Sequence, residues 1–94
     1  MRLRYLTGAH QDLRLIFEYI AKNNPAAARR VITAIRNEAQ TLIEHHHLGR
    51  SGQIEGTREL VHGRHPYVIA YRVQGNEVQV LGVVHTSRKW PENF

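Results

Sequence analysis

The sequence predicts an α+β fold, in which an N-terminal strand precedes an antiparallel helical hairpin packed on a twisted antiparallel sheet, in the order β-α-α-β-β-β. Three observations predict it. Residues 2–6 alternate polar and apolar side chains, residues 7–45 carry two apolar stripes at helical spacing, and residues 57–85 contain three β-rich runs. Because the helix pair and the sheet must each bury one face, we expect them to pack on each other.

Length and charge limit the classes of function. The chain has 94 residues, enough for one two-layer core, so we expect a single domain over 1–94 and no large cofactor. Thirteen lysines and arginines against eight acidic residues give a net charge of +5, and eleven of the thirteen are arginines. This balance favours an acidic partner, either a nucleic acid or a protein with an acidic face. Solvated, salt-bridged arginines would explain the charge equally well.

The composition also indicates the compartment. The absence of cysteine excludes disulfides, thiolate catalysis and cysteine-ligated zinc. The start of the chain, MRLRYLTGAHQDL, lacks the apolar run of a signal peptide, and no stretch approaches the roughly 18 apolar residues of a membrane span. We therefore expect a cytoplasmic protein that does not contact a membrane.

The N-terminal half predicts one strand and two helices. RLRYL alternates apolar and basic side chains, as in a strand with one buried face. Thr7 is the expected N-cap of the first helix. NNPAAARRVITAIRNEAQTLIEH predicts a second helix, with Asn24 as its N-cap and Pro25 at its first position. The apolar stripes consist of Leu13, Ile16, Phe17 and Ile20 in the first helix and of Ala28, Val31, Ile32, Ile35, Ala39 and Leu42 in the second.

The C-terminal half predicts the remaining strands. After the glycine-rich loop LGRSGQIEG come TRELV, PYVIAYRV and EVQVLGVVH, and the last two runs flank a QGNE turn. A two-residue turn at Gly75 and Asn76 makes the numbers of paired residues sum to 151. Nothing local positions the first strand, which we expect to pair inside the sheet. In this register Tyr71 lies opposite Val80, Ile69 opposite Gly82 and Tyr67 opposite Val84.

This register separates an apolar face of the sheet from a more polar one. Tyr67, Ile69 and Tyr71 fall on the apolar face, which should meet the helices and form the core. The other face carries Arg72 and ends at His85, so we expect it to be the working surface.

The segment EHHHLG, with three adjacent histidines, is a candidate metal site. Adjacent histidines on a helix point about 100° apart, so His45, His46 and His47 cannot converge on one ion without partners from elsewhere. Histidines in a last helical turn also complement the helix dipole. We therefore predict helix-end or loop histidines and no metal site.

Two other stretches offer basic side chains to an acidic target. Arg58 lies in the predicted strand TRELV, where an ion pair with a neighbouring glutamate explains it as well as a phosphate contact does. HGRHPY places His62, Arg64 and His65 in an accessible loop, and a solvated turn explains them as well as a binding loop does.

His85 stands where the last strand leaves the sheet, and Arg88 and Lys89 follow closely. Histidine transfers protons near neutral pH and arginine stabilises a pentavalent phosphate. His85, Arg88 and Arg72 could therefore cleave RNA with its 2′-hydroxyl as the nucleophile. A strand-end histidine bonded to the backbone is the simpler interpretation from local sequence alone.

Four segments of the chain match a known family in the right order: DLRLIFEYIAKNNPAAA, GRSGQIEGTRELV, PYVIAYRV and VQVLGVVHTSRKWP. Together they resemble the RelE/ParE superfamily of toxins from bacterial type II toxin–antitoxin operons, from about residue 9 to residue 91. The resemblance implies the fold derived above and a cytoplasmic toxin that inhibits growth. It also implies a co-encoded acidic antitoxin that wraps the toxin in a hetero-oligomeric complex.

Two activities occur in that superfamily. RelE-like members cut messenger RNA on the ribosome, whereas ParE-like members lack the catalytic set and poison DNA gyrase. The segments NPAAA, GRSGQIEGTREL and YVIAYRV resemble ParE-like members, and the lysine-rich stretch of RelE-like nucleases is absent. We therefore expect gyrase poisoning, with ribosome-dependent mRNA cleavage as the alternative and a non-toxic basic nucleic-acid-binding domain as a third. Whether the protein is an enzyme stays open.

These activities assign different roles to the same C-terminal region. We expect Trp90 to anchor the end of the chain against the sheet and His85 to orient it by a hydrogen bond. In a nuclease the catalytic residues would be His85, Arg88 and Arg72. In either case the expected target-binding residues are Arg58, Arg64, His65, Arg88, Lys89 and Trp90.

Overall fold

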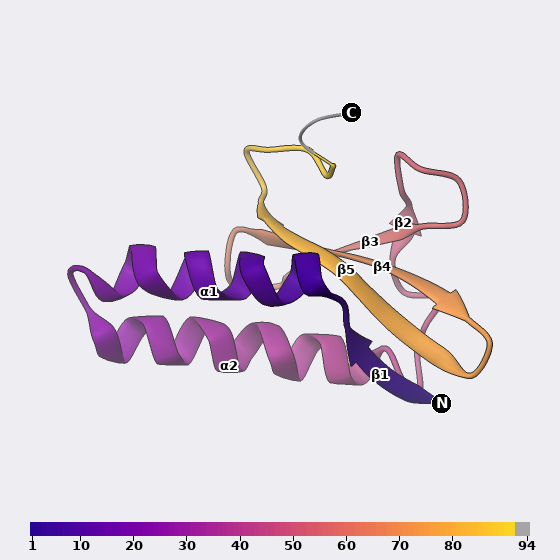
Figure 1. Ribbon diagram of the computed structural model, residues 1–94, viewed down its shortest axis with the longest axis horizontal. Helices are drawn as coiled ribbons and strands as arrows, with labels where there is room; N and C mark the ends of the chain where they lie inside the picture. The colour runs from indigo at the N-terminus through magenta and orange to yellow at the C-terminus, as the bar shows by residue number, and fades with distance from the viewer. Residues whose placement is uncertain (92–94) are drawn as a thin grey trace.

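Two helices pack on one face of a five-stranded sheet (Figure 1). The computed structural model describes residues 1–91, and the last three residues of the predicted domain, 92–94, lie outside the described residues. In chain order the elements are β1 (Arg2–Tyr5), α1 (Thr7–Ala21), α2 (Pro25–Thr41), β2 (Arg50–Ser51), β3 (Arg58–Val61), β4 (Tyr67–Gln74) and β5 (Glu77–His85).

The predicted α+β fold is confirmed, but the sheet is mixed. Its strand order is β1-β5-β4-β3-β2, and β1 runs parallel to β5 while the other neighbours are antiparallel. The prediction that the first strand pairs inside the sheet is wrong, because β1 is an edge strand. The local connections between β3, β4 and β5 occupy one side of β5, so the first strand takes the other side. The two-residue β2 lies in the stretch predicted as a loop.

The two helices begin in different ways. Asn24 caps α2 as predicted, since its Oδ1 accepts the Ala27 N–H at 3.0 Å and Pro25 is the first helical residue. The predicted Thr7 cap is wrong, because α1 begins at Thr7 and its N-cap, Leu6, makes no side-chain cap. The Leu6 N–H instead donates to the Val80 carbonyl at 3.0 Å, so β5 holds the entry to α1. The second helix ends at Thr41, four residues earlier than predicted.

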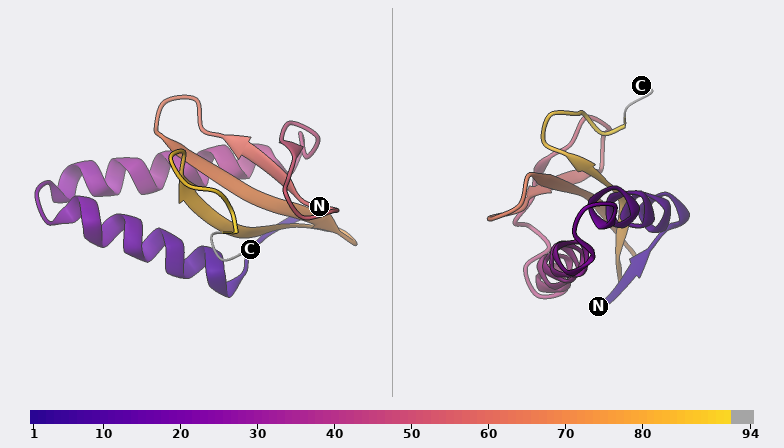
Figure 2. Two further views of the ribbon diagram at one scale, coloured as in Figure 1. Left: turned by 90° about the horizontal axis from the view of Figure 1, so that it is seen from above. Right: turned by 90° about the vertical axis from the view of Figure 1, so that its left-hand side faces the viewer.

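The predicted apolar stripes form the core between the helices and the sheet. Ile35 of α2 is fully buried, and Leu13 of α1 is 3% exposed. They pack with Ile69 of β4 and with Val80 and Val83 of β5. Figure 2 shows the helical hairpin on one side of the sheet, with the opposite side uncovered by helices. Hydrophobic burial of these residues therefore joins the hairpin to the sheet in one core.

A β-bulge in β5 shifts the predicted register. Tyr71 lies opposite Val80 as predicted, but the pairing then slips by one residue, so that Ala70 lies opposite Gly82 and Tyr67 opposite His85. The predicted pairs of Ile69 with Gly82 and of Tyr67 with Val84 are therefore wrong. Leu81 is the extra residue, and after it every side chain of β5 lies on the face opposite to the predicted one.

Tyr71 attaches the loop after α2 to the sheet. Its fully buried phenol donates to the His46 carbonyl at 2.8 Å and accepts the Gly49 N–H at 2.9 Å. Burial raises the pKa of the phenol, which therefore stays protonated and able to donate. A methyl group on Gly49 would lie within 3.0 Å of the phenol ring, so this close approach requires glycine.

Replacing Tyr71 with phenylalanine should therefore lower the free energy of unfolding by about 1–3 kcal/mol, because the buried Gly49 N–H loses its acceptor. A urea titration measures the change, and Tyr19→Phe is the control because that side chain is 74% exposed. Equal midpoints for Tyr71→Phe and the control would contradict the role given to the phenol.

Candidate functional site

The side of the sheet away from the helices carries a groove bounded by the segment that follows β5. Residues 86–91, called the tail below, rise from the end of β5 opposite the helical hairpin (Figures 1 and 2). Between the tail and the β2–β3 region lies a hollow of about 440 Å³, called the open-face groove. Its apolar lining includes Val61, Val68 and Trp90, and its basic rim includes Arg50, Arg88 and Lys89.

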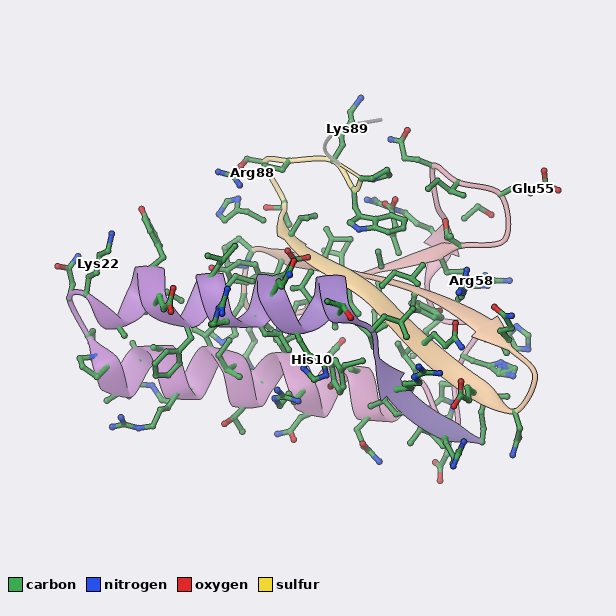
Figure 3. All side chains as sticks on the ribbon, viewed as in Figure 1. His10, Lys22, Glu55, Arg58, Arg88 and Lys89 are labelled. Carbon is green, nitrogen blue, oxygen red and sulfur yellow. The ribbon has the colours of Figure 1, made fainter. Side chains whose placement is uncertain are left out.

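Trp90 holds the tail on the sheet at Gly82. A methyl group at position 82 would collide with the indole, lying against Nε1 and 2.8 Å from Cδ1. Because Gly82 has no side chain, the indole can approach the backbone of β5 closely. This places the basic residues Arg88 and Lys89 beside the open-face groove, both exposed (Figure 3).

The start of the tail is a tight turn held by His85. The ring Nδ1 of His85 accepts the Ser87 N–H at 3.1 Å and lies 2.9 Å from the Ser87 hydroxyl. The Arg88 N–H donates to the His85 carbonyl at 2.9 Å, and the Thr86 N–H donates to the Pro66 carbonyl at 2.8 Å. The turn therefore rests on backbone contacts at both ends.

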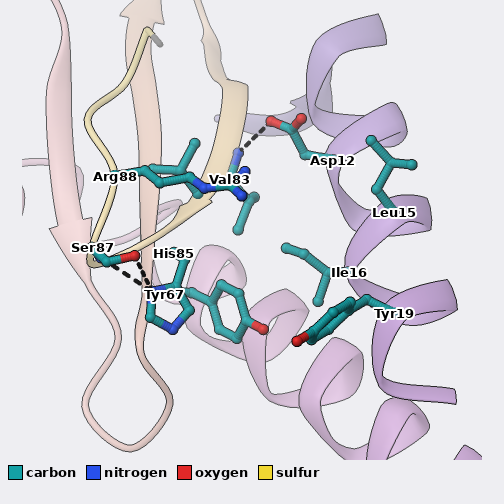
Figure 4. A pocket seen from close by; sticks show the side chains of 10 residues that line it. Asp12, Leu15, Ile16, Tyr19, Tyr67, Val83, His85, Ser87 and Arg88 are labelled. Atoms are coloured by element: carbon teal, nitrogen blue, oxygen red, sulfur yellow. Dashed lines mark hydrogen bonds between the residues drawn. The ribbon is translucent and has the colours of Figure 1, made fainter. Parts of the chain in front are cut away.

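His85 lies on the helix side of the sheet, so the prediction that it belongs to the open face is wrong. The bulge at Leu81 pairs His85 with Tyr67, whose ring packs against the core, and the two rings meet edge to face at 5.6 Å. His85 lines a second hollow of about 490 Å³ between α1 and the end of β5, called the α1 groove (Figure 4). Its lining includes Asp12, Leu15, Tyr19, Tyr67, His85 and Arg88.

The structure brings His85 and Arg88 together but not Arg72. Arg72 follows Tyr67, the partner of His85, by five residues along β4, a separation of about 17 Å. It also lies on the other face, where its Nε donates to Gln79 Oε1 at 2.7 Å. The predicted three-residue nuclease set is therefore not assembled.

Arg72 belongs instead to a polar chain at the turn end of the open face. Gln79 donates to Glu77 Oε1 at 2.9 Å, and the Glu77 carboxylate lies 3.2 Å from the Arg2 guanidinium and 3.7 Å from that of Arg4. The hydrogen bond from Gln79, together with the charges of Arg4 and Arg2, lowers the pKa of Glu77. These contacts neutralise this end of the open face in part.

Arg58 contacts the protein's own backbone. Its guanidinium donates to the Gly49 carbonyl at 2.8 Å and reaches the His47 carbonyl at 3.5 Å, on the side of the sheet where Tyr71 binds the same loop. The ion pair with Glu59 is made by Arg50, at 3.2 Å. Arg58 is thus held apart from the tail, on the other side of the sheet from the open-face groove.

His62 pins the loop that carries Arg64 and His65. It was predicted to be accessible, but it is 9% exposed, and its Nδ1 accepts the N–H groups of Arg64 and His65 at 3.0 and 3.1 Å. The Nε2 therefore carries the proton and donates to the Ala34 carbonyl at 3.2 Å. Since Pro66 binds the tail, this loop lies next to the start of the tail.

His45, His46 and His47 belong to the loop after α2. The rings of His46 and His47 lie 4.0 Å apart and are tilted by 51°, and the His46 carbonyl accepts a hydrogen bond from the Tyr71 hydroxyl. Within residues 1–91, no three histidine, aspartate or glutamate side chains gather in a way that could hold a metal ion. In the same part of the chain, neither helix has the length and apolarity that crossing a bilayer would require.

Sequence comparison relates the chain to a family of toxins. Residues 3–90 match the family described as ParE toxin of type II toxin–antitoxin system, parDE. The protein named as toxin Y4kP in Sinorhizobium fredii is 40% identical over 91 residues, which cover 97% of this chain and 94% of the relative. Toxin RelE3 of Caulobacter vibrioides is 34% identical over 80 residues, covering 83% and 86%.

A solved structure agrees with the sequence matches. A chain from the chromosomal ParDE TA system of P. aeruginosa superposes with a TM-score of 0.81 at 27% identity, covering 90% of this chain and 95% of the other. The family match spans nearly all of the described residues, and the fold match covers both the helical hairpin and the sheet. The chain therefore belongs to the ParE toxin family of type II toxin–antitoxin systems.

Proposed function

We propose that this toxin arrests growth by poisoning DNA gyrase, with the tail and the open-face groove as the surface offered to the target. The observation that carries the proposal is the separation of Arg72 from His85, because a nuclease would need those groups around one phosphate. The tail, in contrast, presents Arg88 and Lys89 together beside the apolar groove and Trp90. Such a surface suits binding to an acidic partner without chemistry of its own.

Ribosome-dependent mRNA cleavage is the second candidate, and one observation favours it. His85 and Arg88 line the α1 groove together with Tyr67, so a proton-transfer group, a cation and a phenol share one hollow. The relative from C. vibrioides is also named RelE3. Family membership favours both toxin activities over a non-toxic nucleic-acid-binding domain.

A cognate acidic antitoxin is the proposed partner in the cytoplasm, in a hetero-oligomeric complex. Its support is the P. aeruginosa relative, which comes from a ParDE toxin–antitoxin system, and the net charge of +5 on this chain. We propose that the antitoxin silences the toxin by covering the tail, so that Arg88 and Lys89 no longer reach the target. Arg64 and His65, on the loop beside the tail, would extend the same surface.

Induction of the toxin in cells tests the choice of target. We expect broken chromosomal DNA with intact messenger RNA, and with purified gyrase we expect stabilised cleaved DNA in the presence of the toxin. Co-expression of the antitoxin encoded beside the toxin should suppress both effects. Intact DNA accompanied by codon-spaced cuts in translated messenger RNA would overturn gyrase poisoning and support the nuclease.

A further inference from the structure

The outer edge of β5 changes its neighbour at the bulge. Within residues 1–91, β1 pairs with β5 only from Glu77 to Val80, and the chain then turns away into α1. From Leu81 onward the edge of β5 faces α1. An N–H on such an edge needs an acceptor from elsewhere if it is to be held in place.

Asp12 of α1 supplies that acceptor. Its Oδ2 accepts the Val83 N–H at 2.9 Å, and this contact joins the first helix to the last strand just after the bulge (Figure 4). A hydrogen bond from a backbone N–H to a carboxylate is stronger than one to a neutral oxygen. The carboxylate therefore fixes the path of β5 at the residue that follows Gly82.

The same carboxylate also approaches Gly82, the residue that Trp90 of the tail contacts. A methyl group at Gly82 would lie 3.1 Å from Asp12 Oδ2 and 2.8 Å from Trp90 Cδ1. The carboxylate of α1 and the indole of the tail thus meet at one backbone position, although they come from opposite ends of the chain. Any displacement of β5 at Val83 would move the surface on which Trp90 rests.

We propose that Asp12 is a positioning residue. By accepting the Val83 N–H it keeps Gly82 in the position that Trp90 contacts, and it thereby determines where the tail places Arg88 and Lys89. The consequence for toxicity rests on the proposed role of the tail as the target surface. The consequence for the position of Trp90 does not, since it follows from the contacts of Asp12 and Gly82 alone.

The test uses Trp90, the only tryptophan in the chain, as a spectroscopic probe. In the purified full-length toxin, Asp12→Ala should shift the emission to longer wavelength and make it easier to quench with acrylamide. Asp12→Asn should stay close to wild type, because its amide oxygen can still accept the Val83 N–H. Glu18→Gln, an exposed position on the same helix, is the matched control for loss of charge.

A second variant calibrates the probe while keeping Asp12 in the sequence. Gly82→Val should force the indole off the sheet and define the emission of a displaced tail. Circular dichroism and thermal melting show whether each variant is folded. If Asp12→Ala does not fold, hydrogen exchange of the Val83 amide in the wild-type protein is measured instead. Protection of this amide, although it lies on the strand edge, supports the proposal. Exchange as fast as that of a solvated amide overturns the proposal.

Induction of the same variants in cells separates this proposal from the proposed function. If Asp12→Ala displaces Trp90 and reduces toxicity, and Asp12→Asn restores both properties, the positioning role of Asp12 and the proposed role of the tail are both supported. Displaced Trp90 with full toxicity supports the positioning by Asp12 and contradicts only the role of the tail. Unchanged emission and quenching in folded Asp12→Ala overturns the positioning, whatever the toxicity.

Discussion

Replacing Ile35 with alanine should lower the free energy of unfolding by about 2–5 kcal/mol, because the truncation leaves a cavity between α2 and the sheet. Ile35 is fully buried and packs in the cluster that contains Leu13, Ile69 and Val80. Little else can fill the space, since the neighbouring side chains come from three different elements whose positions are fixed by the sheet and the helical hairpin. Denaturant titration of the purified protein measures the loss.

Thr33→Ala is the matched control for this prediction. Thr33 lies on the exposed side of the same helix, so its replacement should change stability by no more than about 0.5 kcal/mol. A loss below half a kcal/mol in Ile35→Ala would show that the apolar stripe of α2 does not carry the core.

Replacing Arg88 with glutamate should abolish most of the growth arrest if the toxin poisons gyrase, because the change reverses the charge of the tail where the target is proposed to bind. His85→Ala should be mild in that case, since it removes the hydrogen bonds to Ser87 and the ring contact with Tyr67 but leaves the backbone contacts of the turn and the charge of the tail. If the toxin is a nuclease, His85→Ala should instead reduce RNA cleavage by about 10²–10⁴-fold while antitoxin affinity stays near wild type. Growth after induction, gyrase assays and RNA cleavage assays measure the three effects.

Arg29→Glu controls for the change in net charge, because Arg29 is an exposed residue of α2, a helix that packs on the other side of the sheet from the tail (Figure 1). It should leave toxicity near wild type. Toxicity that survives both Arg88→Glu and removal of residues 89–94 would refute the role of the tail under either activity.

The helical part of the fold could be predicted because its signals are local. Asn24 and Pro25 are adjacent and define a helix start by their own chemistry. The stripe that contains Leu13 and the one that contains Ile35 repeat at helical spacing, and burial follows directly from that spacing. The prediction that Thr7 caps the first helix was wrong because the start of α1 is held by a tertiary hydrogen bond between Leu6 and β5, which no local sequence pattern indicates.

The end of β5 could not be predicted, because both of its faces are apolar there. Alternation fixes the register only where one face is polar, and the run VLGVVH is apolar until His85. A bulge can therefore be inserted at Leu81 at no cost in buried apolar surface. The consequence for the site was direct, since the predicted position of His85 depended on counting along this strand.

The candidate site was predicted in part for the same reason. Trp90 lies on the sheet as expected from its amphipathic ring and its place after a strand. Asp12 escaped notice and His62 was expected in an accessible loop, because each acts on backbone groups of another element and neither stands in a distinctive motif. Their roles depend on which N–H groups lack a strand partner, and that is a property of the assembled sheet.

The bulge at Leu81 gives β5 one residue more than the strand it pairs with. Because Leu81 is the extra residue, its removal would leave Ala70 opposite Gly82 and Tyr67 opposite His85, so Trp90 would keep its contact with Gly82 and the α1 groove would keep its histidine. A strand that kept Leu81 without the bulge would instead turn Gly82 toward the helices and move His85 to the open face. The bulge, and not the number of residues in β5, therefore decides which of the two grooves receives the histidine at the end of the strand. When members of the family are aligned, a one-residue gap at position 81 is thus compatible with the same placement of that histidine.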